Sequence, residues 1–296
     1  MLVAYAALLA VSGCSGLPPH PEVDERAESF SPQRARAHYA ALAGLGTRPP
    51  GSESAERARR YVERELRWAG AEPVQGGARG ADRPVLAWLP GASEDRILVV
   101  APWSPGLDGA LPDDAGVAVL LELARALARQ PAPYRVGLAA AIVPPIADAR
   151  PQTQRAAVRA SGTALVAELE ADGGFEGLRA VLVLEPRVRG GTRVVRDLRS
   201  HPVFRDLFWQ TAARLGHDAA FPEDGGWATP EGIQAAFLSA GYGRVLSLVD
   251  EGSGLNPTGA SAMLPDPIAF EPVGAVAYEG LIRLMGRLAR VDAFSP

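Results

Sequence analysis

The stretch "ILVVAPWSPGLDGALPDDAGVAVLLELARAL", residues 97–127, contains the elements that decide the predicted fold of this chain. It begins with a continuously apolar run, 97–101, which is typical of a strand buried on both faces of a sheet. A loop with acidic residues follows, and a densely apolar, central helix is predicted from Asp114 to Arg129. This order of elements indicates an α/β protein, in which ligands bind outside the carboxyl ends of the strands.

The same alternation of strands and helices continues along the chain. We therefore predict a three-layer α/β/α sandwich with a mostly parallel, mixed central sheet of about six to eight strands. Without an internal repeat or a linker, residues 31–296 are predicted to form one domain. The other predicted helices are 32–43, 54–69, 153–170, 202–215 and 273–289, and the strands are 85–89, 97–101, 135–143, 180–184, 235–238 and 245–249.

Composition excludes several classes of function. The 296 residues are 47% hydrophobic, which supports a large core and argues against global disorder. The net charge of −4 and the absence of a basic cluster give no indication of nucleic-acid binding. All thirty basic residues are arginine, which excludes a P-loop lysine and a Schiff-base lysine, although a codon bias explains the same fact. The single cysteine excludes an intramolecular disulfide and a cysteine-based zinc site.

The first fourteen residues, "MLVAYAALLAVSGC", form an apolar run that is too short for a permanent membrane span. Its end, Val11 to Cys14, resembles the bacterial lipoprotein box, in which the cysteine is lipidated. We expect a signal peptide at 1–13, a lipid anchor on Cys14 and a polar, proline-rich tether at 14–30. This implies a place in the bacterial cell envelope, on its periplasmic or extracellular face. The alternative is an ordinary secretory signal with an incidental cysteine.

Two neighbouring blocks carry a family resemblance. Residues 45–74, "LGTRPPGSESAERARRYVERELRWAGAEPV", and the strand and helix of 97–127 resemble, in the same order, the opening of the di-zinc aminopeptidases. That family, in metallopeptidase clan MH, also contains the glutaminyl cyclases, and the resemblance is weaker after residue 190. It implies the fold predicted above, with two zinc ions held by histidines and carboxylates and a glutamate acting as general base.

The sequence departs from this family at most of the metal positions. The first histidine pattern, H-x-D, is matched by Pro102, Trp103 and Ser104, and proline cannot bind a metal. A Glu-Glu pair is replaced by Pro144 and Pro145, and the last histidine is missing from "TGASAMLPDP" at 258–267. The four histidines of the chain match none of the ligand positions, and we expect structural or surface roles for them: His20, His38, His201 and His217.

Carboxylates remain as vestigial metal-site candidates. Aligned without a gap on Gly116, the bridging position holds Pro112, whereas a one-residue deletion places Asp113 there with Asp114 beside it. Glu185 in "AVLVLEP" matches the fourth ligand of the family. An all-oxygen cluster would favour calcium or magnesium, and the alternative is that Asp113 or Asp114 simply caps the helix. The full candidate set is Asp108, Asp113, Asp114, Glu185 and Asp224.

These departures lead to two functional hypotheses. The first is a lipid-anchored envelope protein with the aminopeptidase fold that acts by binding a peptide or protein, without catalytic residues or a metal cofactor. In that protein Trp103 and Trp227 are candidate aromatic walls of the cleft. The alternative is a metallo-exopeptidase with a rearranged metal site. No G-x-S-x-G elbow supports a catalytic serine, and glutaminyl cyclase activity would need the missing zinc ligands.

Overall fold

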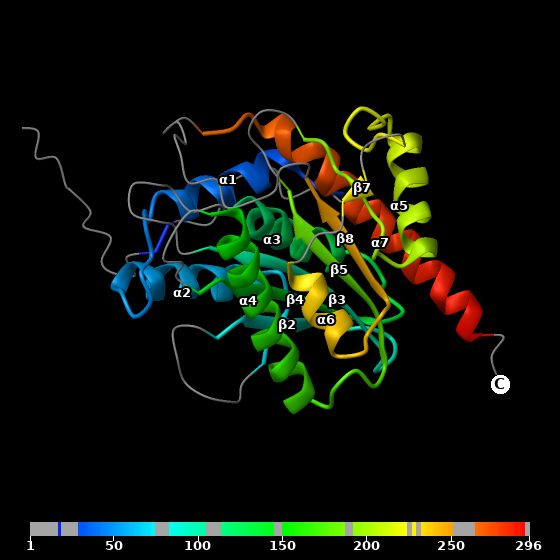
Figure 1. Cartoon of the computed structure of the whole chain (residues 1–296), viewed down its shortest axis with the longest axis horizontal. Coiled ribbons are helices and arrows are strands. Elements are labelled where there is room, and N and C mark those ends of the chain that lie inside the picture. The colour runs from blue at the N-terminus through cyan, green and yellow to red at the C-terminus, as the bar shows by residue number, and fades with distance from the viewer. Residues whose placement is uncertain are drawn as a thin grey trace, which may run out of the picture.

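The computed structural model describes residues 17–18, 29–74, 83–104, 114–144, 150–186, 192–223, 227–228, 232–250 and 264–293. Within these ranges strands and helices alternate as the sequence predicts (Figure 1). The helices are α1 Pro32–Ala43, α2 Glu53–Trp68, α3 Ala115–Leu127, α4 Pro151–Ala171, α5 Pro202–Leu215, α6 Ile233–Ser239, η1 Pro267–Phe270 and α7 Glu271–Asp292. The strands are β1 Glu72–Pro73, β2 Val85–Leu89, β3 Arg96–Trp103, β4 Arg135–Ile142, β5 Leu178–Glu185, β6 Arg196–Asp197, β7 Trp227–Ala228 and β8 Val245–Val249. None of the described helices has the length and hydropathy of a membrane span.

The main sheet has six strands in the order β1-β2-β4-β3-β5-β8. The four strands β4, β3, β5 and β8 are parallel to one another, and β2 joins them antiparallel to β4. The prediction of a mostly parallel, mixed sheet is therefore confirmed. In such a sheet the carboxyl ends of the parallel strands open at one edge, which is where a site is expected.

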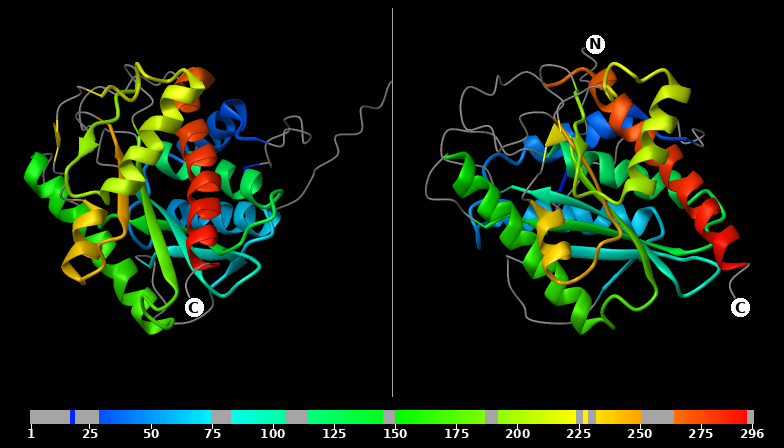
Figure 2. Two further views of the ribbon diagram at one scale, coloured as in Figure 1. Left: turned by 90° about the vertical axis from the view of Figure 1, so that its right-hand side faces the viewer. Right: turned by 45° about the vertical axis from the view of Figure 1, so that its right-hand side comes forward.

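Helices cover both faces of this sheet, so the molecule has three layers (Figure 2). Side chains of successive strand residues point to opposite faces, and β3 follows this rule. Ile97, Val99 and Ala101 belong to one buried cluster with α1, α2, α3, α5 and α7. Leu98 and Val100 belong to a second cluster with α4 and α6. Burial on both faces explains why the strand sequences are continuously apolar.

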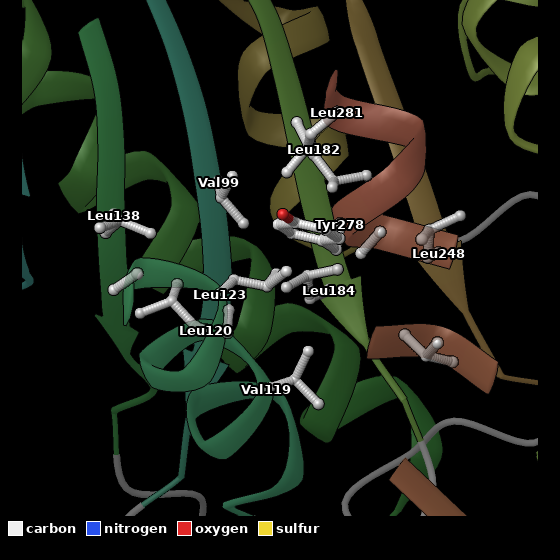
Figure 3. Close-up of a cluster of buried hydrophobic side chains, with 14 of the residues drawn as sticks. Val99, Val119, Leu120, Leu123, Leu138, Leu182, Leu184, Leu248, Tyr278 and Leu281 are labelled. Carbon is white, nitrogen blue, oxygen red and sulfur yellow. The ribbon is translucent and has the colours of Figure 1, made fainter. Parts of the chain in front are cut away.

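Helix α3 is the central helix that the sequence predicts. Every residue from Ala115 to Leu127 except Arg125 is buried. Figure 3 shows Val119, Leu120 and Leu123 of this helix among side chains of the sheet and of α7. The start of the helix is fixed by Gly116, where an added Cβ atom would lie 2.8 Å from the carbonyl oxygen of Leu184. The first turn of α3 thus packs directly on the ends of β3 and β5.

The outer edge of β8 is covered by the segment 194–201, which the sequence analysis did not predict. The backbone N–H of Val195 donates to the carbonyl of Val249 (3.0 Å), and that of His201 donates to Val245 (2.8 Å). Between them the Ser200 hydroxyl accepts a hydrogen bond from the Ser247 N–H (3.0 Å). These contacts satisfy groups that an open edge strand would leave exposed.

One predicted strand is wrong. Residues 235–238 lie inside α6, whose residues from Ile233 to Phe237 are all buried. In a short apolar run, periodicity does not distinguish a strand from a buried helix. Here the helix is the form that packs against α4 and β8. The short strands β1, β6 and β7, with two residues each, were also missed, because two residues carry no pattern.

Candidate functional site

The candidate site is the sheet mouth, which we define as the carboxyl ends of β3 and β5 together with the start of α3. Pro102, at the expected position of a histidine ligand, lies in β3 opposite Ala141 of β4. Proline has no backbone N–H to donate, but no hydrogen bond to β5 is lost here, because the pairing of β3 with β5 ends at Val100. The next residue, Trp103, turns its side chain into the cluster that contains α3.

Asp114 is the buried centre of the sheet mouth. Its side chain is 0% exposed, and its Oδ1 atom accepts hydrogen bonds from Nη2 of Arg48 (2.5 Å) and Nε1 of Trp103 (3.0 Å). Asp114 stands at the N-cap of α3, but its side chain makes no capping hydrogen bond. Asp114 is thus the N-cap residue that the alternative interpretation named, but its carboxylate forms a buried ion pair and does not cap the helix.

Arg48 joins this ion pair to the loop after α1. Its Nη1 atom donates to the carbonyl of Leu42 (3.0 Å), and its Nη2 atom donates to the carbonyl of Ser104 (3.2 Å). The guanidinium also lies over the Trp103 ring, 5.5 Å from its centroid. Because one flat group reaches two backbone carbonyls, a carboxylate and an aromatic face, lysine could not replace it. Arg48 lies in the stretch 45–74 that carries the family resemblance, but the sequence alone does not indicate its role.

The second carboxylate oxygen of Asp114 differs from the first. Oδ2 is buried and has no hydrogen-bond partner among the described residues. Burial raises the pKa of the Asp114 carboxyl, and Arg48 and Trp103 act in the opposite direction. A buried acceptor without a donor is uncommon in folded proteins and calls for an explanation. It gives the sheet mouth a capacity to accept one further hydrogen bond or positive charge.

Glu185 ends β5 but faces the other side of the sheet. Its Oε1 atom lies 2.7 Å from the place that a Cβ atom on Gly232 would take, beside Val158 of α4. This follows from strand alternation, since Val183 also points to the α4 and α6 face. The carboxylates of Asp114 and Glu185 therefore serve opposite faces, and the structure does not bring them together as one site.

The described part of the sheet mouth does not fit a zinc centre. It offers Pro102, Trp103 and Ser104 at the end of β3 and Pro144 after β4, at positions where the resemblance to the di-zinc aminopeptidases implies nitrogen and carboxylate ligands. Among the residues that the structure describes, no three His, Cys, Asp or Glu side chains are grouped to hold a metal ion. Asp114 Oδ2, a buried oxygen of the sheet mouth that has no partner among the described residues, lies on a carboxylate that pairs with a guanidinium.

The histidines that the structure describes lie away from this site. His38 is buried in α1, with Nδ1 2.9 Å from the Tyr61 hydroxyl. His201 stacks on Phe204 with ring centroids 4.2 Å apart, and burial lowers its pKa. His217 follows α5 and is half-buried.

Several sequence candidates fall outside the described residues. They are Cys14, His20, Asp108, Asp113, Pro145 and Asp224. Of the two candidate aromatic walls, Trp103 is buried at 4% exposure with its indole N–H on Asp114, and it does not line an open surface. Trp227 contributes its backbone to β7, opposite Arg196.

Comparison with known proteins identifies the fold. No protein-family model matches the sequence, and no curated protein matches it. Solved structures do match. A leucine aminopeptidase precursor from Bacteroides thetaiotaomicron has 16% identity and a TM-score of 0.70, with 85% of this chain and 96% of that one covered.

Two further structures carry the names of two different activities. A glutaminyl cyclase from an Acidobacteriales bacterium has 18% identity and a TM-score of 0.67 over 88% of this chain and 96% of its own. A Zn-dependent exopeptidase from Parabacteroides distasonis has 16% identity and a TM-score of 0.63, with coverage of 85% and 97%. The fold implied by the resemblance is thereby confirmed, and at these identities the likeness concerns the fold alone.

Proposed function

We propose that this chain is a lipid-anchored protein of the bacterial envelope that uses the fold of metallo-exopeptidases and glutaminyl cyclases for binding, without metal catalysis. The observation that carries this proposal is the ion pair between Arg48 and Asp114 at the sheet mouth. A fixed guanidinium supplies there the positive charge that a metal ion supplies in a zinc enzyme. Unlike a metal ion, it holds no open position for a reactive water.

The burial of this pair supports the proposal further. Arg48 is 3% exposed and is held by two carbonyls as well as by Asp114. A divalent cation on Asp114 would place like charges in contact in a region that the fold shields from solvent. Displacing Arg48 would leave a buried guanidinium without its counter-charge, which is strongly unfavourable. For this reason we propose that the sheet mouth holds the ion pair and no metal ion.

The ligand that we propose is a peptide or protein. The similar structures include an aminopeptidase and an exopeptidase, whose names describe action on peptide ends. The lipid anchor would be Cys14, which would hold the domain at the membrane surface.

Metal analysis with an activity assay tests the non-catalytic character. Protein that lacks residues 1–13 and carries Cys14→Ser is incubated with excess zinc and desalted. We expect well under one zinc ion per chain and no cleavage of aminoacyl reporter substrates above a buffer control. Stoichiometric zinc with turnover that chelators abolish would establish the metallo-exopeptidase instead. Asp108, Asp113 and Asp224 would then be the first residues to replace.

Fractionation tests the anchor separately. The full chain, expressed in a bacterial host, should sediment with membranes, and Cys14→Ser should release the protein or stall its processing. A Cys14→Ser protein that is processed normally and still sediments with membranes would show that Cys14 is not the anchor.

A further inference from the structure

Helix α2 has an exposed face that combines arginines with one tryptophan. With 100° of rotation per residue, Arg57, Arg60, Arg64, Arg67 and Trp68 fall within an arc of roughly 100°. We call these five residues the basic face of α2. The indole of Trp68 is 63% exposed, which is unusual for a tryptophan.

The opposite side of the helix is fixed to the protein. Ala58, Tyr61, Val62 and Leu66 are completely buried against the core. Acidic side chains balance part of this charge: Glu65 pairs with Arg64 at 2.6 Å, and Glu63 pairs with Arg67 at 3.3 Å. Glu53 lies on the same arc in the first turn, whereas Arg60 is exposed.

The segment that follows the predicted lipidation site is held against this helix. The side chain of Leu17 packs on the main core. The carbonyl oxygen of Pro18 accepts a hydrogen bond from Nη2 of Arg64 at 2.6 Å. The chain therefore reaches the domain surface beside the basic face of α2.

Chain length then limits how far the anchor can be from this face. Cys14 precedes Leu17 by three residues, which span at most about 11 Å when fully extended. Trp68 follows Arg64 by four residues, a rise of about 6 Å along the helix. A lipid on Cys14 would enter the bilayer so close to α2 that the basic face would lie at the headgroups.

We propose that the basic face of α2 is a membrane-contact surface, with the indole of Trp68 among the headgroups and the arginines beside anionic lipids. This inference rests on the proposed lipidation of Cys14. Tryptophan favours the interface because its ring is apolar and its N–H is polar. Arginine side chains can lie along the interface with their charges at anionic headgroups. The domain would then have a defined orientation on the membrane.

Fluorescence quenching by brominated lipids tests the contact. The mature chain from Cys14 onward is coupled through that thiol, its only cysteine, to a maleimide lipid in vesicles of phosphatidylcholine and phosphatidylglycerol. The emission of Trp68 is taken as the difference between this protein and its Trp68→Phe variant. When brominated phosphatidylcholine replaces the ordinary lipid, we expect this emission to fall by about half, as for indoles at headgroup depth.

A matched reporter lies at the opposite edge of the sheet. Leu198 is 56% exposed, in the segment that covers β8, whereas α2 packs on β1 and β2 at the other edge. In the Trp68→Phe, Leu198→Trp variant the added emission should remain unchanged. An unquenched Trp68, or equal quenching at position 198, would overturn the proposal. Chemical coupling makes this result independent of whether cells lipidate Cys14, which the fractionation experiment decides.

Discussion

Helix α3 has two buried carboxylates, Glu122 in its middle and Asp114 at its N-cap. They differ in how many of their oxygen atoms accept hydrogen bonds. Oε1 of Glu122 accepts hydrogen bonds from the Ser31 N–H (2.9 Å) and from Arg125 (2.6 Å). Its Oε2 atom accepts from Arg125 (2.9 Å) and lies 3.5 Å from Arg34. On Asp114, both donors meet a single oxygen, and the other has no partner among the described residues.

This difference distinguishes a structural cross-link, Glu122, from a carboxylate that keeps one unused hydrogen-bond acceptor, Asp114. Glu122 ties the start of α1 to the central helix and uses both oxygens for it. Asp114 lies about two turns away, where the strands open, and one acceptor is left unused. Burial is the main cause of a raised pKa in both carboxyls, and their hydrogen-bond partners are what distinguish them.

The largest effect is expected at the saturated cross-link. Glu122→Ala would remove the carboxylate that lies 3.5 Å from the buried guanidinium of Arg34, and it would remove the acceptor of the Ser31 N–H. We expect the free energy of unfolding to fall by about 3–5 kcal/mol, measured by urea denaturation. Glu122→Gln, which keeps a hydrogen-bond acceptor, should lower the free energy of unfolding by less than Glu122→Ala. A loss below about 1 kcal/mol for Glu122→Ala would mean that this cluster is not a structural cross-link.

A smaller loss is expected at the sheet mouth. In Asp114→Ala the Arg48 guanidinium keeps its bonds to the carbonyls of Leu42 and Ser104, so we expect a loss of about 2–3 kcal/mol in urea denaturation. The double variant Arg48→Met, Asp114→Leu removes both charges and should recover most of that loss. If the double variant is less stable than Asp114→Ala, the ion pair contributes more to folding than a well-packed apolar pair.

Trp103→Phe tests the hydrogen bond that the uncharged indole N–H of Trp103 donates to Asp114. It removes one of the two hydrogen bonds to Asp114 Oδ1 and keeps the aromatic face under Arg48. We expect a loss of about 1 kcal/mol in thermal or urea unfolding. A loss as large as that of Asp114→Ala would show that the ring's packing, and not its N–H, is what the site requires.

The smallest expected effect is a dependence of the protein's stability on pH through Asp114. Because burial raises the pKa of Asp114 above its ordinary 3.8, the folded state holds this proton more tightly than the unfolded chain. The group's contribution to stability is then complete below pH 3.8 and is lost as pH rises through the raised pKa. Relative to Asp114→Asn, the wild-type protein should thus gain stability on acidification, in urea titrations at several pH values. The opposite slope would show that Arg48 outweighs burial.

Local pattern was sufficient for most of the fold. The apolar runs at 85–89 and 245–249 form β2 and β8 with the predicted bounds. The run at 235–238 has similar composition but forms a helix, since its packing on α4 could not be read from so few residues. The absence of histidine from the positions where the resemblance implies metal ligands was visible in the sequence, whereas the role of Arg48 was not. Its partners Asp114 and Ser104 lie 66 and 56 residues away.

The sequence by itself determined the α/β class and the central helix, because each of these depends on the pattern of neighbouring residues. The tertiary structure alone decided that a guanidinium neutralises Asp114 and that Glu185 faces the other side of the sheet. It also placed Leu17 and Pro18 against α2. Such contacts join residues far apart in the chain, and only the packed sheet and helices bring them within hydrogen-bond distance.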